Sequence, residues 1–271
     1  MPRQGCLLVF ATGFLVMPYC LADFVPISVS EQVQGSGNIL LCPFGLTEDC
    51  LNNNFDFAAS NSASGPYQIS KSGQAALSAQ GFINSDISVD ATAQQTSDVS
   101  GANISVNMAT QPEMDGTAYP VSANVTVSNQ FLLLFNLTSP AIVHLTGSID
   151  AYAIGGFYYN GLALGDAQFL FTGPGLQFEQ DPCGEGFCFP GNLTFDEQFL
   201  LNPGTYTFSA FTDASIAAEF FIDGAPPTTA DLSVNADFTP VPETEPRWMA
   251  MVLAALIVIK CRAAALTGGR V

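Results

Sequence analysis

Basic residues are scarce in this sequence, and their scarcity excludes several classes of partner. The chain has 271 residues, with 24 Asp and Glu against only 6 Lys and Arg and one His, which gives a formal net charge of −18. Every acid falls within residues 23–246, where Lys71 is the only base. Such a surface repels the phosphates of nucleic acids and anionic lipid headgroups, so we expect no nucleic-acid partner.

Helical periodicity is missing between the two ends of the chain, and alternation takes its place. Hydrophobic residues make up 48% of the sequence and include 22 Phe, which supplies a core and excludes a disordered chain. Polar and apolar residues alternate with period two over residues 86–94, 103–108, 122–128, 143–153, 205–210 and 231–238. One buried and one wet face is typical of antiparallel sheets. The sequence therefore predicts an all-β fold, an antiparallel β-sandwich, with a jelly-roll arrangement as its finer form.

The N-terminus has the features of a secretory signal peptide over residues 1–22. Arg3 precedes the apolar stretch 6–17, and small residues occupy the positions that a signal peptidase inspects, so we expect cleavage after Ala22. The alternative is an uncleaved membrane anchor, but the stretch is shorter than the roughly 20 residues that a spanning helix needs. Cleavage leaves residues 23–240 as the exported domain.

The C-terminus has three parts. A Pro- and Glu-rich linker covers 241–247, an apolar segment with a basic stop covers 248–262, and a short tail covers 263–271. The segment contains no charge until Lys260 and Arg262, and these bases favour a cytoplasmic tail. We therefore expect a short transmembrane helix over 248–262 that anchors the exported domain, transiently or permanently, to the membrane.

This tail resembles the PEP-CTERM sorting signal of exported bacterial proteins. Val241, Pro242 and Glu243 match the motif, whereas Thr244 stands in place of its second Pro, which returns only at Pro246. The resemblance implies processing by an exosortase-type enzyme in a Gram-negative bacterium that makes exopolysaccharide. It also implies a place in the cell envelope or the extracellular matrix. The alternative is a plain tail anchor that is never cut.

Four cysteines remain in the exported domain: Cys42, Cys50, Cys183 and Cys188. Four cysteines in an oxidising compartment predict two disulfides. The sequence permits three pairings, and we favour Cys42–Cys50 and Cys183–Cys188, because Gly and Pro residues between the partners let each segment fold back. The spacings are unlike the C-x-x-C knuckles of a zinc site.

No constellation of residues predicts an enzyme. His144 is the only histidine, and the sequence contains no Gly-x-Ser-x-Gly elbow that would position a nucleophilic serine beside it. Asp196 and Glu197 are adjacent, so they point to opposite faces of a strand. No D-x-D-x-D-G calcium loop occurs either. We therefore assign no catalytic residue, no metal ligand and no cofactor.

One aromatic cluster offers a binding function. Phe157, Tyr158 and Tyr159 lie in a glycine-bounded segment and could stack on sugar rings, although core packing is the more common role of such residues. The leading interpretation is an exported, non-enzymatic cell-surface or extracellular-matrix protein associated with exopolysaccharide. A carbohydrate-binding module of the envelope is the second hypothesis, and a polysaccharide-degrading hydrolase is the third.

Overall fold

Strands make up nearly all of the described structure. The computed structural model describes residues 24–42, 50–79, 85–118, 121–152, 155–156, 161–183, 191–219, 222–223 and 228–241. All of them belong to one compact unit, Ala22–Val241. These ranges contain no helix, and so none long and apolar enough to cross a bilayer. The predicted signal peptide and the predicted transmembrane helix over 248–262 lie outside the described residues.

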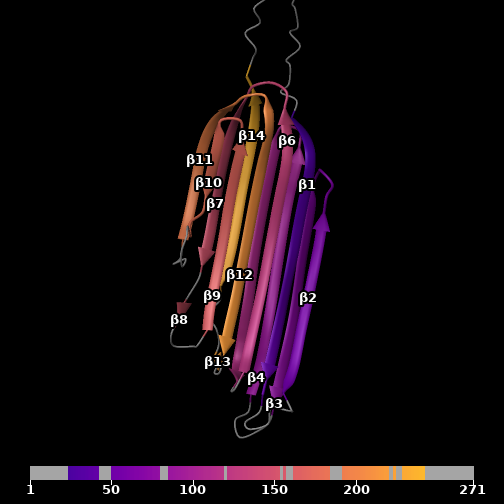
Figure 1. Ribbon diagram of the computed structural model, residues 1–271, viewed down its shortest axis with the longest axis vertical. Helices are drawn as coiled ribbons and strands as arrows, with labels where there is room; N and C mark the ends of the chain where they lie inside the picture. Colours follow the sequence, from indigo (N-terminus) through magenta and orange to yellow (C-terminus); the bar gives the residue numbers. More distant parts are fainter. Residues whose placement is uncertain are drawn as a thin grey trace, which may run out of the picture. The chain divides into compact units, whose positions relative to one another are not determined.

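The strands form two antiparallel sheets (Figure 1). In sheet A the order is β10 (Leu176–Gln180), β9 (Gly161–Gly173), β12 (Gly204–Glu219), β6 (Val121–Leu137), β1 (Phe24–Leu41) and β2 (Leu51–Asn61), with β8 (Gly155–Gly156) beside β9. In sheet B it is β11 (Gly191–Leu201), β7 (Ala141–Tyr152), β14 (Thr229–Pro240), β5 (Asn103–Ala118), β4 (Ser85–Ser100) and β3 (Tyr67–Ala79), with β13 (Ile222–Asp223) beside β5. The predicted all-β, antiparallel β-sandwich is confirmed.

Only some of the strands that are consecutive in the sequence are also neighbours in a sheet. β3, β4 and β5 follow one another as a meander, whereas the chain passes from one sheet to the other after β2, β5, β6, β7, β10, β11 and β12. A jelly roll is a β-sandwich built from two Greek keys. That finer arrangement stays a prediction for this protein.

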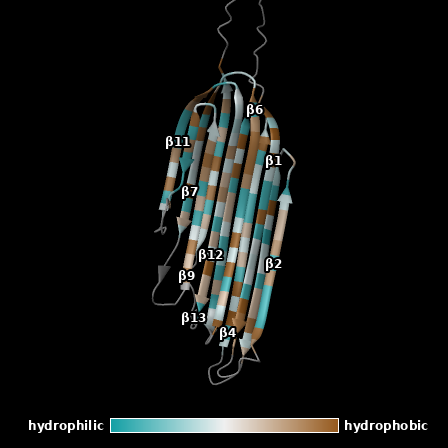
Figure 2. Cartoon of the chain, in the orientation of Figure 1, coloured by the Kyte–Doolittle hydropathy of each residue, from teal (hydrophilic) through white to brown (hydrophobic). Residues whose placement is uncertain are grey.

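Alternation along the strands places the core between the two sheets. In β4 the residues Ile87, Val89, Ala91 and Ala93 are buried, and in β14 the residues Leu232, Val234, Ala236 and Phe238 are buried. Figure 2 shows the resulting exchange of brown and teal along the long strands. Because successive side chains of a strand point to opposite faces, one face of each sheet packs inward and the other faces water.

Aromatic rings fill the core near one end of the sandwich. Tyr206 and Phe135 have ring centroids 5.7 Å apart, and Phe169 and Phe208 meet edge to face at 4.8 Å. The Tyr206 hydroxyl donates to the carbonyl of Asn202, 2.8 Å away, in the connection between β11 and β12. This bond satisfies the polar tip of a buried ring and fixes the chain as it enters β12.

Polar side chains occupy the core farther along the strands. Glu31 of β1 is buried and accepts hydrogen bonds from Ser97 of β4 and from Asn61 of β2, the latter at 2.8 Å. Asn129 of β6 donates from Nδ2 to the carbonyls of Gln94 at 2.9 Å and Ala109 at 3.0 Å in sheet B. The bonds of Ser97 and Asn129 run from sheet to sheet, so they fix how far one sheet can slide over the other, whereas the Asn61 bond lies within sheet A.

The first and last long strands begin and end beside each other. Phe24 at the start of β1 packs on Phe238 near the end of β14, with ring centroids 5.3 Å apart. The backbone N–H of Val241 donates to the carbonyl of Pro140, 3.1 Å away. β1 has 18 residues, which corresponds to a strand of roughly 60 Å. The unit therefore receives and releases the chain at the same end of a long sandwich.

Candidate functional site

The sequence-predicted aromatic cluster cannot be placed from the described residues. Phe157, Tyr158 and Tyr159 lie outside them, between the two-residue strand β8 and the start of β9. The flanking glycines are described: Gly156 pairs with Gly161 in an antiparallel ladder. The carbohydrate contact at these three aromatics stays a prediction.

The sorting residues are described only at their first position. Val241 is half-buried and is hydrogen-bonded to Pro140 through its backbone N–H. Pro242, Glu243, Pro246, Lys260 and Arg262 lie outside the described residues. The motif would thus begin directly where the last strand ends at Pro240.

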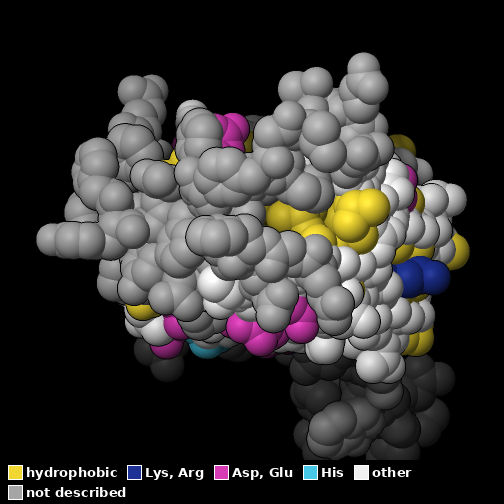
Figure 3. Space-filling view, turned by 90° about the horizontal axis from the view of Figure 1, so that it is seen from below, with side chains coloured by type: hydrophobic (Ala, Val, Ile, Leu, Met, Phe, Trp, Pro, Cys, Tyr) yellow, Lys and Arg dark blue, Asp and Glu magenta, His cyan; other side chains and the backbone are white. Residues whose placement is uncertain are grey.

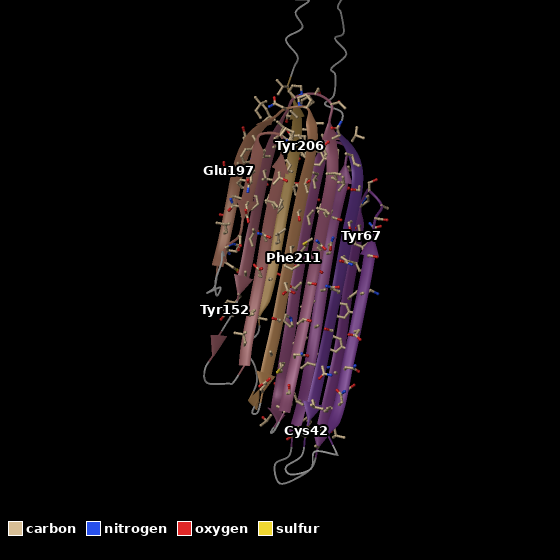
Figure 4. All side chains as sticks on the ribbon, in the orientation of Figure 1. Cys42, Tyr67, Tyr152, Glu197, Tyr206 and Phe211 are labelled. Atoms are coloured by element: carbon tan, nitrogen blue, oxygen red, sulfur yellow. A yellow bond between two sulfur atoms is a disulfide. The ribbon has the colours of Figure 1, made fainter. Side chains whose placement is uncertain are left out.

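The cysteine predictions are confirmed in one case. Cys42 and Cys50 form a disulfide, with Cα atoms 4.2 Å apart, between the end of β1 and the start of β2 (Figure 4). Cys183 is also disulfide-bonded. Its predicted partner Cys188 lies outside the described residues, so the Cys183–Cys188 pairing stays a prediction.

His144 lies on the outer face of sheet B. Its Nε2 lies 2.6 Å from Oδ1 of Asp196 on the neighbouring strand β11. Asp196 pairs with Thr146 and Glu197 with Leu145, so the two acids do lie on opposite faces of β11, as their adjacency predicts. His144 and Asp196 are both well exposed, and among the described residues no serine hydroxyl is hydrogen-bonded to His144 to complete a nucleophilic triad.

A groove of about 480 Å³ lies on the outer face of sheet A. It is lined by β1, β2, β6 and β12, chiefly by Gln34, Ser36, Asp56, Ala58, Thr126, Ser128 and Asp213. Most of these side chains are small, which hollows the sheet surface between the longer ones. The hydroxyls of Ser36 and Thr126 lie 3.1 Å apart across β1 and β6.

The β12 side of the groove carries uncompensated carboxylates. Asp213 stands directly opposite Asp166 in the β9–β12 ladder. Burial raises the pKa of Asp213, and the neighbouring Asp166 raises it further. Burial also raises the pKa of Asp166, as does Asp181, whereas the backbone N–H of Ala167 lowers it. Because Lys71 in sheet B is the only base among the described residues, no cation neutralises this side of the groove.

A metal site does not follow from these acids. Asp166, Asp181 and Cys183 have donor atoms within 4.8 Å of one another. Cys183 is in a disulfide, however, and a disulfide sulfur is not the thiolate that binds metals. Two carboxylates are too few to define a site, so we assign none.

The groove suits a neutral, hydroxyl-rich ligand, and the two carboxylates that line it are not spaced as the pair of a glycosidase is. Hydroxyls, amides and carboxylates all accept or donate hydrogen bonds, whereas an anionic ligand would be repelled. Asp56 and Asp213 lie on strands separated by β1 and β6, about 14 Å apart at the usual strand spacing. For these two lining acids the separation exceeds the roughly 5–9.5 Å between the carboxyl groups of glycosidases, whereas Asp166, outside the lining, lies directly opposite Asp213 on the adjacent strand.

The amino-acid sequence alone does not indicate this groove. The polar positions of each strand alternate with its apolar positions, so they are expected to face solvent. Which of these positions lie side by side depends on the order of the strands in the sheet. One signal was available: Phe211 of β12 falls on the polar phase of its strand, out of step with Tyr206 and Phe208. Figure 4 shows Phe211 near the middle of β12, two residues before Asp213 on the same face.

Comparison with known proteins adds little. No protein-family model matches the chain, and no curated protein matches it. Among solved structures, the VP2 subviral particle of infectious bursal disease virus gives a TM-score of 0.18 at 10% identity, covering 89% of this chain and 74% of that one. The Gx strain of the same virus gives 0.18 at 8% identity, covering 89% and 75%. At such TM-scores the likeness carries no argument about fold or function.

Proposed function

We propose that this protein is an exported, non-enzymatic protein of the bacterial cell surface or extracellular matrix, sorted through its C-terminal tail. Its partners would be an exosortase-type processing enzyme, the membrane through the segment 248–262, and exopolysaccharide. The folded unit would lie outside the cytoplasmic membrane, and the residues at the two ends of the chain would act as its export and sorting signals.

The observation that supports this proposal is that the folded unit spans the residues between the predicted signal peptide and the predicted sorting motif. β1 starts at Phe24, just after the predicted cleavage site at Ala22, and β14 ends at Pro240, just before Val241-Pro242-Glu243. Both strand ends lie at the same end of the sandwich, joined by the Phe24–Phe238 contact.

Two further features support an extracytoplasmic site. The Cys42–Cys50 disulfide is of a kind that persists in oxidising compartments and is rare in the cytosol. The outer faces of both sheets carry Ser, Thr, Asn, Gln and Asp with almost no base, which keeps copies soluble in a crowded, hydrated matrix.

The test is fractionation of an exopolysaccharide-producing Gram-negative host that expresses the full chain. We expect mature protein lacking residues 1–22 in the surface or matrix fraction. A chain that stops after Pro240 should be exported but lost to the medium, and Pro242→Ala with Glu243→Ala should stay uncut in the membrane. Thr244→Ala is the matched control, because Thr244 already departs from the motif. Intact chain in the cytosol, with residues 1–22 attached, contradicts the proposal.

The groove favours a second candidate function, binding of a neutral glycan. Asp213 and Gln34 line the groove and offer hydrogen bonds to sugar hydroxyls. Phe211, two residues from Asp213 on the same face of β12, offers an apolar ring beside the groove. On an array of neutral glycans, saturable binding should weaken in Asp213→Ala and in Phe211→Ala. Ser148→Ala on sheet B is the control and should bind normally. Loss of binding only in Tyr158→Ala and Tyr159→Ala would place the site at the aromatic cluster instead.

A further inference from the structure

The two edges of sheet B are built to continue the sheet. The path from β11 to β3 contains six strands, each antiparallel to the next, so β3 and β11 run in opposite directions. An edge strand presents unpaired N–H and C=O groups to any further strand. If β11 of a second copy lay beside β3, the antiparallel alternation would continue without a break.

Each edge strand carries one charge on the phase that faces the core. Lys71 of β3 pairs with the buried Ala93, and Glu197 of β11 pairs with the buried Leu145. Both side chains are exposed because the sheet ends beside them. Neither makes an ion pair with another described residue. Figure 4 labels Glu197 on one edge of the sandwich. Figure 3 shows dark blue, the colour of Lys and Arg, at one side of the molecule, and Lys71 is the only Lys or Arg among the described residues.

We propose that copies of this protein add head to tail, with β3 of one copy pairing antiparallel with β11 of the next and Lys71 opposite Glu197. The partner is a second copy of the chain, and the contact is heterologous, so it repeats rather than closes as a dimer. This inference goes beyond the proposed function and does not depend on export or on processing of the tail.

The register that joins the two charges also gives full overlap of the two strands. Placing Lys71 opposite Glu197 sets residues 67–77 against residues 191–201, which is the whole of β11. The inward phase is preserved, because Ile69 then meets Phe199 and Ala75 meets Leu193. A slip of one residue would instead turn the apolar side chains of one strand outward.

The same displacement aligns the edges of sheet A. Across sheet B the paired residues Lys71, Ala93, Thr110, Ala230, Ala151 and Gly191 lie in one row, so Glu197 stands six residues along β11 from the level of Lys71. Across sheet A the row of Phe178 in β10 reaches Val29 of β1, and six residues further is Gly35, the partner of Phe57 in β2.

One shift, roughly 20 Å along the strands, therefore sets all of β10 opposite residues 55–59 of β2. It also places Glu179 opposite Asp56 on the outer phase, a pair of like charges that opposes the contact. The levels of the two sheets correspond because Glu31 bonds to Ser97 and Asn129 bonds to Gln94. Phe178 then lies beside Phe57 on the inward phase. A displacement chosen from one charge pair thus aligns both edges of the sandwich.

Charge decides between assembly and protection of the edges. Inward-pointing charges on edge strands usually keep sheets apart. Here the two edges of sheet B carry opposite signs, and the positive one is the only base within residues 23–246. The remaining charge of the domain opposes association, so assembly should strengthen as salt screens that repulsion over a Debye length of about 8–10 Å. Within the overlap, the carbonyl of Ala76 already accepts a hydrogen bond from Asn53 of β2, 2.9 Å away. The pairing of β3 with β11 of the next copy should therefore be tightest farther along β3, around Lys71.

Cross-linking of the full chain tests the register. Lys71→Cys with Glu197→Cys, oxidised mildly, should give a ladder of dimers, trimers and higher species, because opposed residues of a strand pair bring their Cβ atoms within disulfide reach. An equimolar mixture of the two single variants should stop at the dimer. Lys71→Cys with Gln198→Cys is the matched control, since Gln198 points to the other face. A ladder no stronger than in this control overturns the proposal.

Charge exchange tests the recognition. In sedimentation velocity at moderate salt, Lys71→Glu and Glu197→Lys should each weaken association by about tenfold, and the double exchange should restore it. Both positions are exposed, and a near-ultraviolet spectrum equal to that of the wild type would show that each variant folds. Association that is unchanged or stronger in the single variants would mean that the charges guard the edges, and it overturns the proposal.

Discussion

The carboxylate of Glu31 in β1 accepts a hydrogen bond from the hydroxyl of Ser97 in β4, on the facing sheet, with both side chains buried. Burial raises the pKa of Glu31, and the hydrogen bonds from Ser97 and Asn61 lower it by less. Glu31 also raises the pKa of Tyr67, after the effect of burial. A carboxylate that joins two sheets without a cation makes the sandwich sensitive to pH.

We expect the protein to become more stable as the pH falls from about 7 toward about 5. Burial raises the pKa of Glu31, Asp90, Asp166, Asp213 and Asp231 in the folded state. Each such group binds more protons when folded than when unfolded, so its stabilisation is complete below the unfolded pKa and is lost as the pH rises through the folded pKa. Thermal melts across this range check the sign.

Glu31→Gln isolates the contribution of the core carboxylate. The amide can donate to Ser97 and accept from Asn61, as the protonated acid would, so we expect a higher free energy of unfolding than that of the wild type at neutral pH. The melting temperature of this variant should depend less on pH than that of the wild type. Asp86→Asn on the solvent face of β4 is the control. A melting temperature that falls steadily on acidification of the wild type would contradict this account.

The Cys42–Cys50 disulfide should stabilise the edge that β1 and β2 form. It closes a loop with a sequence separation of 8, and the loop-entropy model gives about 2–3 kcal/mol for such a ring. Cys42→Ser with Cys50→Ser should lower the free energy of unfolding by that amount in urea melts. Wild type and variant are compared without reductant, so that the bond at Cys183 is untouched in both. Equal midpoints would show that the ring contributes nothing.

Gly165 lets β9 approach the backbone of sheet B. A Cβ at this position would lie 2.5 Å from the carbonyl oxygen of Thr229 and 2.7 Å from that of Tyr152. Thr229 and Tyr152 pair with each other in the β7–β14 ladder, so they cannot move aside without disturbing it. Gly165→Ala should therefore destabilise the fold by about 1–3 kcal/mol in urea melts.

Gly73→Ala is the comparison for that substitution. There a Cβ would meet the ring of Phe55, 2.1 Å away, rather than backbone. The clash is with a half-buried side chain at the edge of the sandwich and not with the backbone of a strand ladder, so we expect a smaller loss. A larger loss in Gly73→Ala than in Gly165→Ala would show that the backbone at Thr229 yields more readily than the ring.

Alternation predicts strands here, but it does not predict their neighbours. The inward phase of β14, and that of β4 from Ile87 to Ala93, is readable from sequence because apolar residues recur there without interruption. In β1 the same phase contains Glu31, Gly35 and Gly37, so the longest strand of the sandwich has no clear alternation. The glycines are explained only by Phe55 and Phe57 of β2, whose rings fill the space over them. Such exchanges of volume depend on pairing between strands, which local sequence does not encode.

The candidate groove and the charged edges illustrate the same limit. Asp166 and Asp213 are 47 residues apart in the sequence, and only the β9–β12 ladder makes them neighbours. Lys71 and Glu197 become edge residues only when the strand order is known. The disulfide between Cys42 and Cys50 is different, because a short loop limits the choice of partner.

Asn129 provides a stringent test of the polar core. Its Nδ2 donates to the carbonyls of Gln94 and Ala109, and its Oδ1 has no hydrogen-bond partner among the described residues. Asn129→Asp keeps the shape of the side chain but sets a carboxylate against two carbonyl oxygens in a buried site. We expect a loss of about 3 kcal/mol or more at neutral pH, because a buried charge without a partner is strongly destabilising.

The same exchange on the outer face of the strand should have little effect. Asn124 of β6 is exposed, so Asn124→Asp should change the free energy of unfolding by less than about 0.5 kcal/mol. Asn129→Asp should also recover stability on acidification, since protonation restores a hydrogen-bond donor toward Gln94 or Ala109. Urea melts of both variants at neutral and acidic pH measure this difference. Equal losses at the two positions would mean that Asn129 does not join the sheets as its contacts indicate.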